Sequence, residues 1–268
     1  MEFTDKLVAA GRRNSSLLCV GLDPDPSLMP KVGFLEFNKA IVDATADLVC
    51  AYKPNLAFYE ARGIDGLRLL QRTVERIPGH IPIIADAKRG DIGNTARAYA
   101  EAIFVTLGFD ATTVSPYLGF DSIEPFIEHK DKGVFVLCRT SNPGAVDFQD
   151  LVDAHGVPLY AAVARKAREW NVHGNIGLVV GATYPEELKR IRWLCPDMPL
   201  LIPGIGAQGG DLASAVKYGV DAHGERAIIA VSRQVLYASR GKDFAEAARR
   251  SAEELRSGIN NLIGQTGR

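Results

Sequence analysis

Two aspartates and one lysine lie within six residues in the segment 81–95, IPIIADAKRGDIGNT. Asp86 and Lys88 continue a short apolar run, and Gly90 interrupts the run just before Asp91. Alternate residues of a strand point to the same face, so Asp86 and Lys88 would project side by side, with Cα atoms roughly 6.5–7 Å apart. A lysine flanked by two carboxylates should stay protonated, and it could then donate a proton and face developing negative charge. The segment therefore predicts proton chemistry.

The structural alternative for this segment is a surface salt bridge, with Asp91 as the N-cap of a helix over 92–107. A capping role for Asp91 is compatible with a functional role for the other two residues. Because Asp86 and Lys88 directly continue an apolar strand, we favour function for them.

The rest of the chain alternates between apolar runs and amphipathic stretches. Eight apolar runs each end in polar or glycine-rich residues, as expected for strands buried on both faces of a parallel sheet. The runs are 17–23, 48–54, 81–88, 111–116, 133–140, 176–183, 199–206 and 227–233. Helical periodicity is clear at 34–48, 64–77, 95–108 and 158–171. This pattern predicts an α/β protein, a (β/α)8 TIM barrel in which 1–268 form a single domain, with a doubly wound open sheet as the alternative.

A barrel would bring the residues at the ends of its strands together, because active sites of this fold lie at the C-terminal ends of the strands. The expected rim is charged and hydroxylic. It consists of Asp23, Lys53, Asp86, Lys88, Asp91, Ser115, Arg139, Ser141, Thr183, the loop 204–210 and Arg233. The five histidines lie elsewhere, so we expect neither a Ser-His-Asp arrangement nor a histidine-rich metal site.

Asp23 lies at the end of the first apolar run, and Lys53 lies at the end of the second. Consecutive strands of a barrel are neighbours, so Lys53, held by the turn at Pro54, could contact Asp86. Asp23, in GLDPD, is either a turn residue or a carboxylate that accepts hydrogen bonds from the hydroxyls of a sugar.

The last two runs predict a phosphate site. The segment GIGAQGGD, 204–211, precedes a helical stretch, and backbone N–H groups of such loops can bind phosphate. Arg233 ends the eighth run, where its guanidinium could fork onto phosphate oxygens.

The composition limits the class of protein. The net charge is −1 and the chain has no long charged run, so we expect no nucleic-acid partner and no anionic membrane surface. The four cysteines form no C-x-x-C pair and read as buried free thiols. We expect no signal peptide, no transmembrane helix and a cytoplasmic protein.

The ordered motifs resemble the orotidine 5'-monophosphate decarboxylase family. GLDPD, AYKPN, DAKRGDIGNT, CRTSNPG, PGIGAQGGD and VSRQVL occur in the family's order across the whole barrel. The D-x-K-x-x-D spacing is shared with barrels that act on sugar phosphates. The joint presence of Lys53, Ser141, Gln208 and Arg233 is more specific.

The resemblance implies decarboxylation of orotidine 5'-monophosphate to uridine 5'-monophosphate, without a cofactor or metal, by a homodimer with shared sites. It implies that Lys88 stabilises and protonates C6 of the pyrimidine and that Asp86 lies near the substrate carboxylate. The resemblance also implies that Asp23 binds the ribose and that Lys53 bridges the ribose and Asp86. Asp91, Ile92 and Thr95 would reach into the partner's site, and Ser141 would contact the pyrimidine. Gln208 and Arg233 would hold the phosphate, with Pro203 and Gly206 as further substrate-binding residues.

The sequence departs from commoner members in having Ser232 before Arg233 and in the segment 141–158, as in a divergent bacterial subgroup. Two alternatives remain from the residues themselves. One is a magnesium-dependent sugar-phosphate decarboxylase or aldolase on the same barrel, and the other is a non-catalytic nucleotide-binding barrel.

Overall fold

Eight parallel strands form one sheet in the computed structural model, which describes residues 1–206 and 209–265. The strands are β1 Leu18–Gly21, β2 Ala51–Lys53, β3 Ile84–Arg89, β4 Ala111–Val114, β5 Gly133–Arg139, β6 Ile176–Val180, β7 Leu200–Pro203 and β8 Ala227–Val231. All eight coincide with the predicted apolar runs, because strands covered on both faces need continuous apolar sequence.

The sheet closes on itself. Its hydrogen-bonded order is β2-β1-β8-β7-β6-β5-β4-β3, which leaves β2 and β3 at the two ends. Parallel bridges Tyr52–Ile83 and Asn55–Asp86 join these two ends. The prediction of a (β/α)8 barrel is confirmed, and the alternative of an open doubly wound sheet is wrong.

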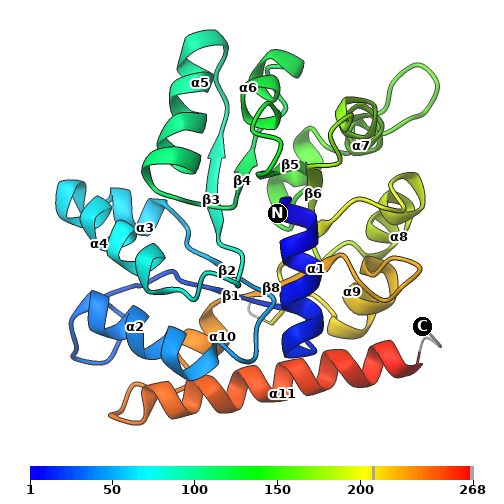
Figure 1. The fold of residues 1–268 in the computed structure, drawn as a ribbon. Coiled ribbons are helices and arrows are strands. Elements are labelled where there is room, and N and C mark those ends of the chain that lie inside the picture. Colours follow the sequence, from blue (N-terminus) through cyan, green and yellow to red (C-terminus); the bar gives the residue numbers. More distant parts are fainter. Residues whose placement is uncertain (207–208, 266–268) are drawn as a thin grey trace.

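Helices surround the strands (Figure 1). They are α1 Phe3–Asn14, α2 Phe34–Thr45, α3 Ala57–Glu60, α4 Gly63–Arg76, α5 Gly93–Glu101, α6 Glu124–Ile127, α7 Leu159–Trp170, α8 Pro185–Leu194, α9 Leu212–Gly219, α10 Arg233–Leu236 and α11 Phe244–Gln265. A π-helical turn, η1 Ala102–Thr106, continues α5, and 3-10 turns η2 Phe120–Ser122 and η3 Pro143–Asp147 follow β4 and β5. The four predicted helices are present within a few residues of their expected ends.

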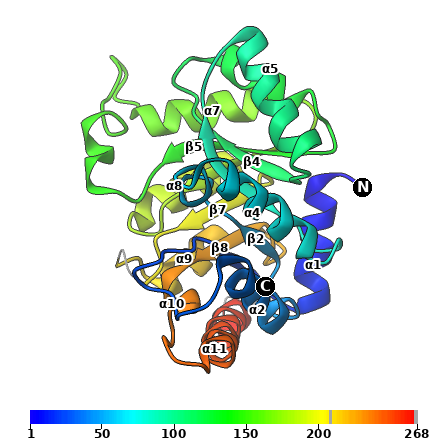
Figure 2. The ribbon, with the colours of Figure 1, turned by 90° about the vertical axis from the view of Figure 1, so that its left-hand side faces the viewer.

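Helix α1 covers one end of the barrel, on the side of the sheet opposite α10 (Figure 2). Phe3 and Leu7 of α1 belong to the core inside the barrel, together with Cys19 and Phe135 from the strands. The rings of Phe3 and Phe135 meet edge to face with centroids 5.7 Å apart. This end is therefore packed shut, and the opposite end carries the polar side chains.

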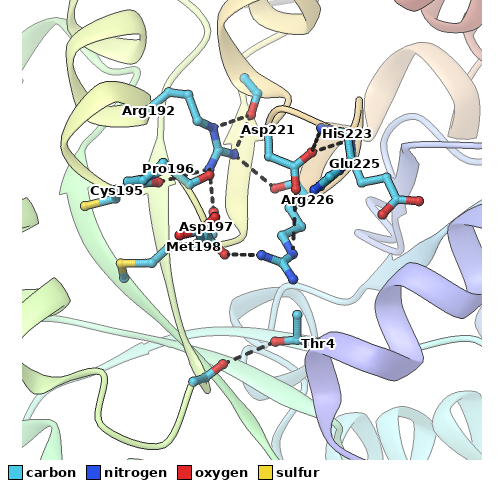
Figure 3. Close-up of polar contacts among 12 residues, drawn as sticks. Thr4, Arg192, Cys195, Pro196, Asp197, Met198, Asp221, His223, Glu225 and Arg226 are labelled. Carbon is cyan, nitrogen blue, oxygen red and sulfur yellow. Dashed lines mark hydrogen bonds and ion pairs between the residues drawn. The ribbon is translucent and has the colours of Figure 1, made fainter. Parts of the chain in front are cut away.

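Arg192 fixes the loops that enter β7 and β8 (Figure 3). Its guanidinium donates to the carbonyl oxygens of Met198 (2.7 Å), Cys195 (3.1 Å) and Gly219 (2.9 Å). These carbonyls follow or end α8 and α9, where helices leave acceptors without partners. Burial lowers the pKa of Arg192 to about 10. The cluster lies at the entry of these strands and is structural.

The cysteine prediction is confirmed. Cys19, Cys50, Cys138 and Cys195 are all free and buried. Burial raises the pKa of Cys19 to about 12, which makes its thiol unreactive. In the described ranges no helix is both long and apolar enough to pass through a membrane.

Candidate active site

Asp86 lies between two lysines at the polar end of the barrel. Its Oδ2 is 2.9 Å from Nζ of Lys53, and its Oδ1 is 2.5 Å from Nζ of Lys88. The side chains of Lys53 and Asp86 are 9% and 12% exposed, whereas that of Lys88 is 50% exposed. The predicted contact between Lys53 and Asp86 is confirmed.

The electrostatics of the site keep Asp86 and Lys53 charged. Burial opposes the carboxylate form of Asp86, but the charges of Lys53 and Lys88 outweigh it and lower the pKa of Asp86. Burial likewise opposes the charge on Lys53, but Asp86 and then Asp23 outweigh it and raise the pKa of Lys53. A carboxylate thus holds two lysine side chains together at the mouth, and Lys88 is the more exposed of the two.

The backbone of β3 does not stay extended through this motif. Lys88 has φ of +47°, a left-handed conformation that non-glycine residues rarely adopt. The register with β4 shifts between Ala85 and Arg89. The side chains of Asp86 and Lys88 do meet, as predicted. The regular strand alternation from which we predicted this contact is absent at Lys88. Strain of this kind, of order 1–3 kcal/mol, concentrates at functional sites.

Thr113 of β4 stabilises this irregularity. Its hydroxyl oxygen accepts hydrogen bonds from the backbone N–H groups of Ala87 (3.1 Å) and Lys88 (2.9 Å). The same hydroxyl donates to Oδ1 of Asp86 at 3.2 Å. Sequence reasoning missed Thr113, and the signal was its place in the neighbouring apolar run ATTVSP, where Ser115 was chosen instead.

Asp91 does not cap the next helix. Helix α5 begins at Gly93 and its N-cap residue is Ile92, so the N-cap prediction is wrong. The carboxylate of Asp91 accepts from the backbone N–H of Ile92 at 2.8 Å. The ion pair of Lys88 is with Asp86, so the predicted lysine between two carboxylates is instead a carboxylate between two lysines. Ile92 and Thr95 are exposed beside Asp91.

Asp23 is tied into the site rather than into a simple turn. Its Oδ1 accepts from the backbone N–H of Asn55 at 3.1 Å, and its Oδ2 accepts from the hydroxyl of Ser232 at 2.6 Å. A Cβ on Gly21 would lie 2.9 Å from Cβ of Ser232, so glycine is needed for this close approach of β1 to β8. Ser232 and Asn55 were not predicted as contacts of Asp23.

A cavity of about 430 Å³ opens beside these residues. It lies at the ends of β1, β2, β7 and β8, and Lys53 joins it to Asp86. Its polar and loop lining includes Asp23, Lys53, Pro203, Ser232, Arg233 and Gln234. The volume is in the range of pockets that hold small ligands.

Two of the four residues predicted to bind the phosphate end line this cavity, while phosphate binding itself stays a prediction. Pro203 and Arg233 line the cavity from β7 and from the start of α10. Gly206 is exposed in the same loop with φ of +75°, and Gln208 lies outside the described residues. Asp211 caps α9 by accepting from the N–H of Ser214 at 2.8 Å.

The side chain of Ser141 is partly accessible, whereas that of Arg139 is buried. Ser141 is half-buried, the second residue after β5, and its carbonyl accepts from the hydroxyl of Thr183 at 3.2 Å. Arg139 is fully buried and does not join the open rim, so its predicted place there is wrong.

Between residues 1 and 206 and between 209 and 265, no group of three or more His, Cys, Asp and Glu side chains is placed to hold a metal ion.

The fold and site define a TIM barrel with a small-molecule cavity and a Lys-Asp-Lys charge cluster at its mouth. Residues 16–250 match the model of the orotidine 5'-phosphate decarboxylase / HUMPS family. This chain belongs to that family.

Two curated relatives extend the match to almost the full length. The chain is 58% identical over 266 residues to an orotidine 5'-phosphate decarboxylase of Dehalococcoides mccartyi, with 97% of this chain and 98% of that protein covered. It is 57% identical over 270 residues to the same enzyme of Roseiflexus castenholzii, covering 98% and 99%. Among solved structures, it resembles the OMP decarboxylase of Leishmania donovani with a TM-score of 0.88 and 42% identity, covering 98% of this chain and 100% of that one.

Proposed function

We propose that this protein decarboxylates orotidine 5'-monophosphate to uridine 5'-monophosphate and CO2, a step of pyrimidine synthesis. The observation that carries the proposal is the carboxylate of Asp86 between Lys53 and Lys88, at 2.9 and 2.5 Å, beside the cavity. Family membership and relatives at 57–58% identity that carry this name support it.

The proposed chemistry needs a fixed cation more than a nucleophile. Heterolysis of the C6–carboxylate bond releases CO2 and leaves the electron pair on a vinylic carbon that the ring cannot easily delocalise. The ammonium of Lys88 faces this carbon, stabilises the developing charge and then gives it a proton. Solvent reprotonates the lysine, whose side chain is 50% exposed.

Asp86 has two roles in this scheme. It holds both lysines, and it lies near the carboxylate that leaves. Two like charges about 4 Å apart repel by roughly 4 kcal/mol at an effective dielectric constant of 20. Large enzymatic accelerations correspond to about 8–23 kcal/mol, so repulsion alone is too small and stabilisation by Lys88 carries most of the effect.

The remaining residues bind the two ends of the nucleotide. Asp23, already held by Asn55 and Ser232, accepts hydrogen bonds from the ribose hydroxyls, and Lys53 joins ribose to Asp86. Ser141 contacts the pyrimidine. Pro203, Gly206, Gln208 and Arg233 receive the phosphate, with Arg233 as the charged partner. Binding at this remote end can serve catalysis at C6.

We further propose a homodimer in which Asp91, Ile92 and Thr95 reach the partner's site. The loops after β3 and β4 support this, because they expose large apolar side chains on one rim. Ile92 is 52% exposed and Tyr117 is 84% exposed, with Leu118 and Tyr99 nearby in sequence. Clustered exposed apolar side chains are typical of interaction surfaces.

We also propose that residues 1–268 form a single domain and that the protein is cytoplasmic. The four free buried thiols support the cytoplasmic location.

The test is the loss of absorbance of orotidine 5'-monophosphate on addition of the purified protein, with and without a chelator. We expect equal loss in both, with uridine 5'-monophosphate as the product. No loss of absorbance contradicts the proposed function. Loss only without the chelator favours a magnesium-dependent enzyme, for which the pairing of Asp86 with two lysines is a poor ion site.

A further inference from the structure

Arg139, the last residue of β5, is a fully buried cation that the proposed chemistry does not use. In the pairing with β6, Leu137 is opposite Val179 and Arg139 is opposite Val180, so Cys138 is an extra residue. Val179 belongs to the core inside the barrel and Val180 to the core outside it. The bulge thus turns Arg139 away from the barrel interior, as bulges near active sites often do.

The guanidinium of Arg139 lies between a ring and two side chains of one loop. Its central carbon is 3.6 Å from the ring centroid of Tyr184, at the start of α8. Its terminal nitrogens are 3.1 Å from Oδ2 of Asp150 and 3.4 Å from Oε1 of Gln149. Oε1 of Gln149 also accepts from the backbone N–H of Thr140 at 2.8 Å. These contacts join both ends of the segment 140–150 to Tyr184.

These contacts of Arg139 contribute little to the stability of the fold. The Nε atom of Arg139 is buried without a hydrogen-bond partner among the described residues, and Asp150 is 40% exposed. An incompletely compensated buried charge gains little over an apolar side chain of the same volume. What Arg139 gives instead is a defined position for the segment, because a planar guanidinium fixes the directions of its contacts.

The segment in question carries Ser141. The carbonyl of Ser141 accepts from Thr183, next to Tyr184. A Cβ on Gly181 would lie 2.7 Å from Cα of Ser141, so the two connections after β5 and β6 are in close contact here. Arg139, through Tyr184, and Ser141, through Thr183, are therefore anchored to the same connection.

We propose that Arg139, Tyr184 and Asp150 form a clasp that positions Ser141 at the mouth for contact with the pyrimidine. The inference rests on the proposed function, in which Ser141 touches the base. Arg139 is then a positioning residue. The clasp serves the base end of the site, whereas the ribose and phosphate end is built from β1, β2, β7 and β8.

The test compares two ligands that share the phosphoribosyl part. Binding of uridine 5'-monophosphate and of ribose 5-phosphate is measured by calorimetry for Tyr184→Leu, Asp150→Ala and the reference Ser141→Ala. Loss of one neutral hydrogen bond predicts about three- to tenfold weaker nucleotide binding for Ser141→Ala, with ribose 5-phosphate unchanged. We expect Tyr184→Leu and Asp150→Ala to give the same selective loss, and the double variant Ser141→Ala/Tyr184→Leu to lose no more. The control Tyr184→Phe keeps the ring face and should bind like the wild type.

The outcomes separate the clasp from the proposed function. If Ser141→Ala weakens nucleotide binding and both clasp variants bind normally, the clasp is wrong. The clasp is also wrong if its variants weaken both ligands equally, which is the mark of a general structural defect. If Ser141→Ala itself binds normally, the assignment of Ser141 to the base fails instead. Asp150→Ala decides the question should Tyr184→Leu not fold, because Asp150 is 40% exposed and its truncation removes no apolar side chain from the core.

Discussion

Replacing Asp86 by asparagine should destabilise the protein strongly, because it leaves Lys53 buried without its counter-charge. The asparagine keeps the shape of the side chain, removes the charge and replaces one acceptor oxygen by an NH2 donor. Lys53 is 9% exposed and 2.9 Å from Asp86, and Lys88 would then face a second cation without the carboxylate between them. Removing one partner of a buried pair costs about 3–5 kcal/mol, whereas an exposed pair contributes about 0–1 kcal/mol.

The magnitude can be checked by equilibrium unfolding in urea at one fixed protein concentration. For Asp86→Asn we expect about 3–5 kcal/mol less free energy of unfolding and a melting temperature lower by roughly 6–20 °C. The matched control is Lys88→Met. Because the side chain of Lys88 is 50% exposed, this substitution should lower the free energy of unfolding by no more than about 1 kcal/mol.

The pH dependence of the difference between wild type and Asp86→Asn gives a second check. The lysines lower the pKa of Asp86 against the opposing effect of burial, so its contribution is complete above about pH 4 and is lost as the pH falls further. Asp86 raises the pKa of Lys53, again against burial, so that contribution is complete below about pH 10 and is lost as the pH rises further. The difference should be level from about pH 5 to 9 and smaller by about 0.7 kcal/mol at pH 3.5. A variant as stable as the wild type at pH 7, or a difference that does not narrow in acid, would refute this account of the charge cluster.

Three further predictions concern the surroundings of the cluster. Arg233→Ala should weaken binding of uridine 5'-monophosphate by about 1.5–3 kcal/mol and leave binding of uridine unchanged, as measured by calorimetry; equal losses for both ligands argue against a phosphate contact. Thr113→Val leaves the N–H groups of Ala87 and Lys88 without an acceptor, so the free energy of unfolding in urea should fall by about 1–3 kcal/mol. Turnover should fall as well, and an unchanged turnover would show that Thr113 does not support the active site. An equal mixture of Asp86→Ala and Asp91→Ala chains should regain about a quarter of the wild-type activity, because half of the dimers formed by random exchange are mixed and each has one intact site. No regain despite subunit exchange, followed by mass spectrometry, contradicts the shared site.

The eight strands were predictable because burial on both faces demands continuous apolar runs, and their number and order of appearance fix the barrel. The contact of Lys53 with Asp86 followed from the neighbouring positions of β2 and β3. Both predictions depend on rules that hold for any chain with this pattern.

The conformation of Lys88 could not be read from the sequence, because its left-handed backbone is held by a hydrogen bond to Thr113 from another strand. The same holds for Arg139. A one-residue bulge turned it from the rim into the packing under the loop, and strand alternation contains no signal for a bulge. Asp91 precedes the N-cap position by one residue, because α5 begins at Gly93, a glycine with positive φ, and Ile92 is its N-cap.

The most direct test of the central claim is the turnover of Lys88→Ala. The account predicts that this variant binds uridine 5'-monophosphate but no longer decarboxylates orotidine 5'-monophosphate, because the cation and proton for C6 are gone while Asp23, Lys53 and Arg233 remain. Progress is followed by the loss of substrate absorbance, and nucleotide binding by calorimetry on the same preparation. Near-normal turnover in Lys88→Ala would contradict the account.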